Sequence, residues 1–212
     1  EAIEVQPPDA NKQFNCLYRN IAVYFQTNPG VGFCVRDLLV TMMMRTYTDR
    51  LCLYLVVDEE QWDPQSFKTF LKAKEFHISP ESDTHRLVVG KGKAQNTSNI
   101  FVMTAKTPLP SPQEFRRDYK ITLTSGSESL ENLRRMEAVR STLSTHDQYA
   151  RAFRWLLITV TQWGQRRQIW GPDPGFLNTQ LVAPICMKAI QLTPEARGPS
   201  LLISFFDLCN DM

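Results

Sequence analysis

The run Leu51–Val57, LCLYLVV, constrains the fold more than any other stretch of this chain. Its bulky apolar side chains alternate over a short length, which is typical of a strand buried inside a sheet. A buried strand needs neighbours, and two more strands are predicted at Arg86–Val89 and Ile100–Thr104. A further strand is predicted at Lys120–Thr124. The segment GKGKAQNTSN between the strands at Arg86–Val89 and Ile100–Thr104 is rich in turn-forming residues, as in a hairpin-like loop. The first part of the chain therefore predicts a sheet.

Helical periodicity appears before, between and after these strands. A helix within residues 12–26 is predicted from apolar residues three and four apart, and we expect it to pack against the later helices. A second helix should begin after Asp63, an N-cap, with Pro64 at its first position. Further helices are predicted over 128–143, from a Thr145–Gln148 capping box onward, and over 176–192. The longest carries an apolar stripe: Tyr149, Phe153, Leu156, Val160 and Trp163, all expected in the core.

These elements predict an α+β chain in three parts. Residues 1–30 form a leader and an N-terminal helix, 31–125 an α/β domain, and 128–212 a helical domain. The chain has 212 residues and a net charge of +2, so its overall charge does not demand a nucleic-acid partner.

Composition also bears on the compartment and on metal binding. The five cysteines are odd in number and widely spaced among apolar residues, which favours buried free thiols over disulfides or a zinc site. No apolar run approaches the ~20 residues of a membrane helix, and no signal peptide opens the chain. We therefore expect an intracellular protein, nuclear or cytoplasmic, although an organelle also fits, with no membrane partner.

One long segment has a specific resemblance. From Phe153 to Ala196 the sequence resembles the central domain of eukaryotic-type poly(A) polymerases, without a gap over 44 positions. The family pattern joins a helix ending in Trp-Ala-Lys-Arg, an Ile-Tyr turn, a helix opening in Gly-Phe-Leu-Gly-Gly, and Gln-Leu-x-Pro-x-Ala. The matching residues are Trp163, Arg166, Ile169, Gly175, Phe176, Leu177, Ala183, Gln191, Leu192, Pro194 and Ala196. The segment Ser200–Phe206 then matches the following helix, which carries a Phe-Phe pair.

The resemblance implies a fold. It implies a nucleotidyltransferase-like (polymerase-beta-like) mixed sheet with helices, followed by an all-helical domain like the poly(A)-polymerase central domain. Because the pattern stops inside or just after a helix, we expect this chain to be one segment of a larger protein.

The resemblance also implies a catalytic site, and the chain departs from it. The family carries Gly-Ser on a short helix, then Asp-x-Asp entering a strand, then a third Asp on a later strand. In the unbroken register Asp49 is the only carboxylate retained, because Tyr47 replaces the first Asp and Ile100 or Phe101 the third. The Gly-Ser pair becomes Val35-Arg36.

The chemistry of that family requires all three carboxylates. Two Mg²⁺ ions ~3.5–4 Å apart must bridge the attacking oxygen and the nucleotide phosphates. A lone carboxylate at Asp49 binds Mg²⁺ weakly and cannot hold a pair, so we predict a degenerate site with no metal and no cofactor.

The candidate binding residues are those that keep a cationic or flat side chain at family positions. Arg166 and Arg167 fall where the family's basic pair lies, and Trp170 replaces a base-stacking Tyr. Arg36 is the remaining candidate for a phosphate contact, whereas Thr161 replaces a triphosphate-contacting Lys.

These features predict a catalytically inactive poly(A)-polymerase-like module that binds RNA or a protein partner in RNA processing. One alternative is an active template-independent RNA nucleotidyltransferase that uses Mg²⁺ through divergent carboxylates. Another is a purely structural dimerisation module.

Overall fold

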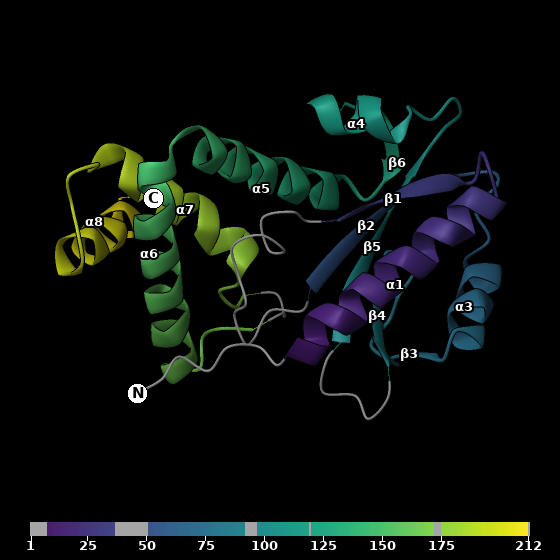
Figure 1. Ribbon diagram of the computed structural model, residues 1–212, viewed down its shortest axis with the longest axis horizontal. Helices are drawn as coiled ribbons and strands as arrows, with labels where there is room; N and C mark the ends of the chain where they lie inside the picture. The colour runs from purple at the N-terminus through teal and green to yellow at the C-terminus, as the bar shows by residue number, and fades with distance from the viewer. Residues whose placement is uncertain (1–7, 37–50, 92–96, 119, 172–174, 212) are drawn as a thin grey trace. The chain divides into compact units, whose positions relative to one another are not determined.

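The structure is a computed structural model that describes residues 8–36, 51–91, 97–118, 120–171 and 175–211 (Figure 1). The described residues fall into two compact units, one ending at Leu133 and the other beginning at Arg134. We call them the sheet unit and the helical unit. Within the described residues, no helix combines the length and apolarity needed to cross a membrane.

The sheet unit contains the four strands expected from the sequence, together with two that were not expected. The strands are β1 (Gly32–Arg36), β2 (Leu51–Asp58), β3 (Phe76–Ile78), β4 (Arg86–Lys91), β5 (Thr97–Ala105) and β6 (Leu123–Ser125). Their order is β1-β2-β5-β4-β3, and β6 pairs with β5. Strands β2 and β5 are parallel and the other pairs are antiparallel, so the sheet is mixed as predicted.

One face of the sheet carries α1 (Pro8–Thr27), which lies across the strands in Figure 1. Its Tyr24 ring meets Phe67 of α3 (Pro64–Ala73) edge to face at 5.1 Å. The expectation that the N-terminal helix packs on the helical domain is therefore wrong, because its aromatic face is buried within the sheet unit. The start of α3 is as predicted: the Asp63 side chain accepts a hydrogen bond from the Gln65 amide.

The opposite face of the sheet is covered by α4 (Pro112–Asp118) and the start of α5 (Ser127–Thr145). Phe115 of α4 is fully buried and meets Phe33 of β1 at 5.4 Å. Leu130 and Leu133 of α5 join the same core cluster as Tyr54 of β2.

The helical unit contains the rest of α5, then α6 (Asp147–Arg166), α7 (Thr179–Leu192) and α8 (Pro199–Asn210). Phe153, Leu156 and Val160 of the predicted stripe are fully buried in its core. Trp163 was expected in the core but is half-buried, and its ring meets Phe206 of α8 edge to face at 4.9 Å. The stripe therefore leaves the core at its C-terminal end.

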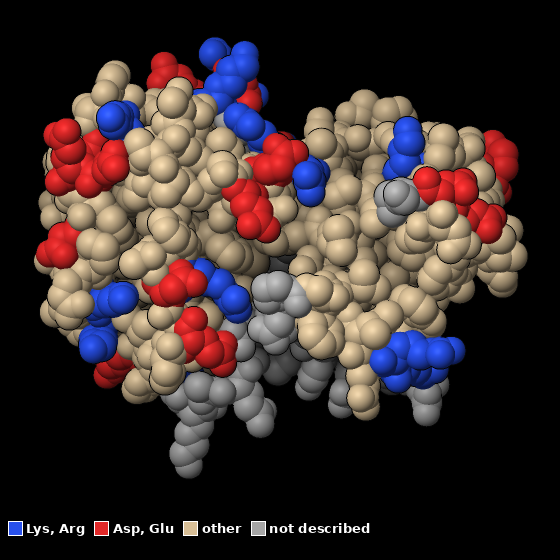
Figure 2. Space-filling model, turned by 180° about the vertical axis from the view of Figure 1, so that it is seen from behind, with Lys and Arg blue, Asp and Glu red and all other residues tan. Residues whose placement is uncertain are grey.

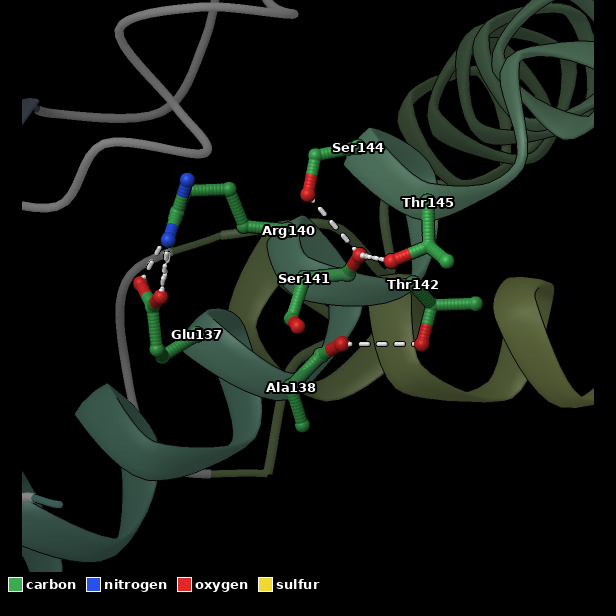
Figure 3. Close-up of polar contacts among 7 residues, drawn as sticks. All are labelled: Glu137, Ala138, Arg140, Ser141, Thr142, Ser144 and Thr145. Atoms are coloured by element: carbon green, nitrogen blue, oxygen red, sulfur yellow. Dashed lines mark hydrogen bonds and ion pairs between the residues drawn. The ribbon is translucent and has the colours of Figure 1, made fainter. Parts of the chain in front are cut away.

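The junction of α5 and α6 differs from the predicted capping box (Figure 3). Thr145 is the last residue of α5, and its hydroxyl donates back to the Ser141 carbonyl at 2.8 Å. Thr142 donates in the same way to Ala138 at 3.0 Å. His146 is the N-cap of α6 and makes no side-chain capping bond. The capping-box prediction is wrong because the Thr145 hydroxyl is engaged by the preceding helix.

Candidate functional site

The start of strand β5 carries buried polar side chains beside the start of β2. Ser98 and Asn99 are 8% and 7% exposed, and Asn99 lies opposite Cys52 in the parallel register. On its other side Asn99 pairs with Val88 of β4. The half-buried Arg86 donates from Nε to the side-chain oxygen Oδ1 of Asn99 at 3.4 Å. A buried amide and a guanidinium therefore meet at this end of the sheet.

Asn99 and Arg86 were not predicted as site residues from the sequence. The signal was available, because a Ser-Asn pair inside an otherwise apolar strand places polar groups where burial requires a partner. The resemblance instead assigned the family's third carboxylate to the next two residues, Ile100 or Phe101.

Those two residues are both apolar and packed. Ile100 has no exposed surface, and Phe101 is half-buried and stacks on Tyr54 at 5.4 Å. Neither position can supply a ligand to a hard cation. Asp49, the carboxylate retained in the register, lies outside the described residues.

Asp58 is the one carboxylate within β2 and β5 as the structure describes them, and it ends β2 at the far side from Asn99. It is 1% exposed, and its Oδ1 accepts from the amides of Glu60 and Gln61 at 3.1 and 2.9 Å. The Thr107 hydroxyl donates to Oδ2. This hydrogen bond, followed by those from the amides, lowers the pKa of Asp58 against the opposing effect of burial. Its oxygens thus stabilise a turn.

The described residues do not fit a pair of Mg²⁺ ions. No group of three or more His, Cys, Asp or Glu side chains among them could hold a metal. At the start of β2 and β5 the side-chain groups that could ligate an ion are the Cys52 thiol, the Ser98 hydroxyl and the Asn99 amide. Mg²⁺ prefers carboxylate oxygens, and neither β2 nor β5 presents one at this end within the described residues.

Arg36 is the last described residue of β1, opposite Leu53 of β2. Its guanidinium carbon lies 5.2 Å from the centre of the Tyr18 ring, on α1. Val35, beside it, is 3% exposed and pairs with Tyr54. The resemblance set Val35 and Arg36 on a short helix, and this is wrong, because both belong to a paired strand.

The other three candidate residues lie together at the end of α6, in the helical unit. Arg166 is in the last turn of α6 and Arg167 is its C-cap; both are exposed. Trp170 follows, half-buried, and forms an isolated parallel bridge with Leu177. The two guanidinium groups suit the negative end of the helix dipole and are available to solvent.

Trp170 packs against α6, the helix that precedes it. A Cβ atom at Gly164 would lie 3.0 Å from Cε3 of the indole. The absence of a side chain at Gly164 therefore allows the ring to pack against α6. Thr161, which replaces a family Lys, is 4% exposed, and its hydroxyl donates to the Leu157 carbonyl at 2.7 Å. The Thr161 hydroxyl is thus buried and bonded to its own helix, so it does not provide a donor for a phosphate.

Charge on the surface is mixed. In Figure 2, Lys and Arg side chains on the face shown form small groups with Asp and Glu side chains between them. The basic residues on the face shown therefore do not form one continuous surface for a polyanion. Binding would depend on local groups such as Arg166 and Arg167.

Comparisons with known proteins place the fold. No protein-family model matches the chain, and no curated protein sequence matches it significantly. Among solved structures it is similar to CdnC of E. coli MS115-1 with ATP, at a TM-score of 0.56 and 13% identity, covering 94% of this chain and 64% of that one. It is also similar to a mutant of the Cid1 poly(U) polymerase bound to MgATP, at 0.53 and 12% identity, covering 88% of this chain and 51% of that one.

These similarities support a nucleotidyltransferase-like fold for the chain. The chain spans between half and two thirds of the length of the two structures. At such low identity the likeness concerns the fold, and residue roles must come from the side chains themselves.

Proposed function

We propose that this chain is a nucleotidyltransferase-fold module that binds RNA without adding nucleotides to it, as part of an RNA-processing assembly. Its poly(A)-polymerase-like segment supplies the RNA context, and the exposed Arg166 and Arg167 supply the phosphate contacts.

The observation that carries this proposal is that strand β5 contains no carboxylate side chain. The strand lies parallel to β2, and its residues Thr97–Ala105 include no Asp or Glu. The resemblance assigns the family's third carboxylate to this strand, at Ile100 or Phe101. Asn99 offers a neutral amide there, already bonded to Arg86. An amide lacks the charge that two adjacent Mg²⁺ ions require.

A second candidate is an active nucleotidyltransferase. The similarity to Cid1, a poly(U) polymerase bound to MgATP, favours it. On this hypothesis Asp49 and a carboxylate from another part of the chain would hold Mg²⁺. The two candidates differ in one measurable property, which is primer extension.

The test is an extension assay with the purified chain. A 5′-labelled single-stranded RNA primer is incubated with each of the four nucleoside triphosphates, with Mg²⁺ or Mn²⁺, and the products are resolved on a denaturing gel. We expect no added nucleotides. The Asp49→Asn variant tests the retained carboxylate, and Asp207→Asn, an exposed carboxylate of α8, is the matched control.

Extension that Asp49→Asn abolishes and Asp207→Asn preserves would overturn the inactive module in favour of the second candidate. Extension that both variants preserve would point to a contaminating enzyme. A chain that neither extends nor binds RNA at low salt would overturn the RNA-binding role and favour a protein partner instead.

A further inference from the structure

The helical unit contains a pocket that is lined by none of the candidate binding residues described above. It has a volume of about 460 Å³ and lies between the first half of α6 and the start of α8. Its lining residues are Gln148, Arg151, Ala152, Trp155, Arg197, Gly198 and Leu201. The volume is in the range of sites for small ligands, which is about 300–1,000 Å³.

Trp155 is the aromatic wall of this pocket. It is 39% exposed, although it lies on a helix whose next residues, Leu156 and Leu157, are fully buried. An indole on a surface helix exposes a large apolar area to water unless another group covers it. A flat ring of this size is a stacking partner for any nucleobase.

The pocket is also cationic. Arg151 lies one turn before Trp155 on α6, so the two side chains share one face of the helix. Arg151 is exposed, and no hydrogen bond or ion pair to another described residue engages it. Of the described residues that line the pocket, two are arginines and none is Asp or Glu.

The guanidinium of Arg197 is held in place by hydrogen bonds to the backbone. Its Nη1 donates to the carbonyls of Pro194 and Ala196 at 2.6 and 2.7 Å. A guanidinium has five N–H donors, so Nε and Nη2 retain donors for a further acceptor. A fixed fork of this kind binds phosphate with little loss of side-chain entropy.

The N-terminus of α8 adds to the same positive field. Gly198 is the N-cap of α8 and lines the pocket. The first turn of a helix carries partial positive charge and favours anions. Gln148, at the pocket edge, offers an amide that can both donate to and accept from a base edge.

We propose that this pocket, which we call the Trp155 pocket, binds a nucleoside phosphate, with the base stacked on Trp155 and the phosphate held by Arg151 and Arg197. The phosphate comes from a free nucleotide or from one residue of an RNA chain. An acidic peptide would satisfy the arginines but would leave the flat indole and the amide of Gln148 without matching partners.

The test measures binding of labelled oligonucleotides and of nucleotide competitors. Anisotropy of a 5′-labelled single-stranded RNA is followed at low salt with the purified chain, and AMP is then added as competitor. Trp155→Ala should weaken RNA binding at least about fivefold, as loss of one stacked base does. Arg151→Gln combined with Arg197→Gln should weaken it and lower the steepness of its salt dependence.

Arg154→Gln is the matched control, because Arg154 is an exposed arginine of α6 that does not line the pocket. It should change affinity by less than about twofold, as expected for a surface cation outside the site. Trp155→Phe keeps a flat ring and should retain most of the binding; circular dichroism verifies that each variant is folded.

Displacement of the RNA by AMP, lost in Trp155→Ala, would assign the pocket to nucleotides in general. RNA binding that depends on Trp155 but resists AMP would assign it to an RNA chain. If neither ligand binds, or if Trp155→Ala and the arginine pair bind as tightly as the unmodified chain, the proposal is wrong. Equal weakening by Arg154→Gln would also overturn it, since binding would then follow general surface charge.

The proposal stands independently of the function proposed above. Arg166 and Arg167 lie at the other end of α6 from Arg151. A chain that loses RNA binding on replacement of Arg166 and Arg167 but keeps AMP binding separates the two sites. If only the Trp155 variant loses AMP binding, the Trp155 pocket is the AMP site and the proposed RNA contacts of Arg166 and Arg167 are unaffected.

Discussion

At the residue scale, Asp58 links a buried charge to the stability of the sheet unit. Its folded pKa is lowered by the Thr107 hydroxyl and by the amides of Gln61 and Glu60. A lowered carboxylate pKa stabilises the fold above the unfolded value of ~3.9, and this stabilisation is lost as pH falls through the folded pKa. We predict that Asp58→Asn lowers the melting temperature at pH 7 and that the difference from the unmodified chain shrinks below about pH 4.

The asparagine keeps an oxygen that can accept from the two amides, so this comparison isolates the charge. Thr107→Val removes the main donor to the carboxylate and should itself reduce the pH dependence. Thermal unfolding followed by circular dichroism between pH 7 and pH 3 measures both effects. A difference between Asp58→Asn and the unmodified chain that is constant over this range would contradict the prediction.

Burial also sets the reactivity of the thiols. Cys34 of β1 is 8% exposed, and burial raises its pKa to about 12, against smaller opposing effects of Arg116 and Arg36. The thiolate is the reactive form, so this group should resist alkylation at pH 8. Cys186 of α7 has no exposed surface, and burial likewise raises its pKa. We predict that mass spectrometry after a short iodoacetamide treatment finds Cys34 and Cys186 unmodified in the native chain. Both should react once the chain is unfolded, and prompt modification of native Cys34 would disprove the prediction.

At the scale of elements, one aromatic contact joins α6 to α8. Trp163 is half-buried and meets Phe206 edge to face at 4.9 Å. Truncating a fully buried Trp costs about 3–5 kcal/mol, so a half-buried one should cost about 2 kcal/mol. A double-mutant cycle with Trp163→Ala and Phe206→Ala should give a coupling energy of about 0.5–1.5 kcal/mol. Additive effects of the two changes in urea unfolding would show that the rings do not stabilise each other.

A second element-scale contact is the packing of Trp170 on Gly164 of α6. Alanine favours a helix over glycine by about 1 kcal/mol, but its Cβ would press on the indole, and overpacking costs about 1–3 kcal/mol. We predict that Gly164→Ala destabilises the chain, yet stabilises a chain that already carries Trp170→Ala. Urea unfolding of the four variants measures this reversal of sign. The same sign in both backgrounds would mean that the indole does not limit the residue at Gly164.

How much of the fold could be predicted depended on how local the signals are. The start of α3 was predicted because Asp63 and Pro64 act within one helical turn. Strands β2, β4 and β5 were predicted from apolar runs. Strands β1 and β3 and the short α4 were missed. A helix of seven residues such as Pro112–Asp118 has too few apolar positions to show a period. The half-burial of Trp163 could not be predicted, because it depends on the tertiary packing of Phe206 of α8 against it.

The candidate site was predictable only in part, for a related reason. The absence of a carboxylate on β5 could be read from the sequence, because the strand itself was predicted. The contact between Arg86 and Asn99 could not, since it requires the pairing of β4 with β5 in one register. The Trp155 pocket is lined by residues of α6 and of the start of α8, and their spacing in the sequence does not predict that they meet.

At the scale of the whole molecule, the mixed surface charge predicts how RNA binding should respond to salt. Net charge is only +2, so long-range attraction is weak and affinity must come from a few local phosphate contacts. Binding should therefore be weak, tolerant of sequence, indifferent to Mg²⁺, and largely lost between low and physiological salt. For single strands the logarithm of affinity falls with that of salt at a slope of about −0.7 per phosphate contact.

Replacing Arg166 and Arg167 together by Gln should reduce the magnitude of that slope by about 1.4, because two fewer counterion-releasing contacts are made. The matched control is Arg116→Gln with Arg117→Gln, an exposed pair that likewise ends a helix, α4. Anisotropy titrations at four salt concentrations give the slope for each variant. The control pair should leave it unchanged, because cations outside the contact surface release no counterions on binding. Equal slopes for all three chains, or an equal reduction in both variants, would remove the end of α6 from the RNA-binding surface.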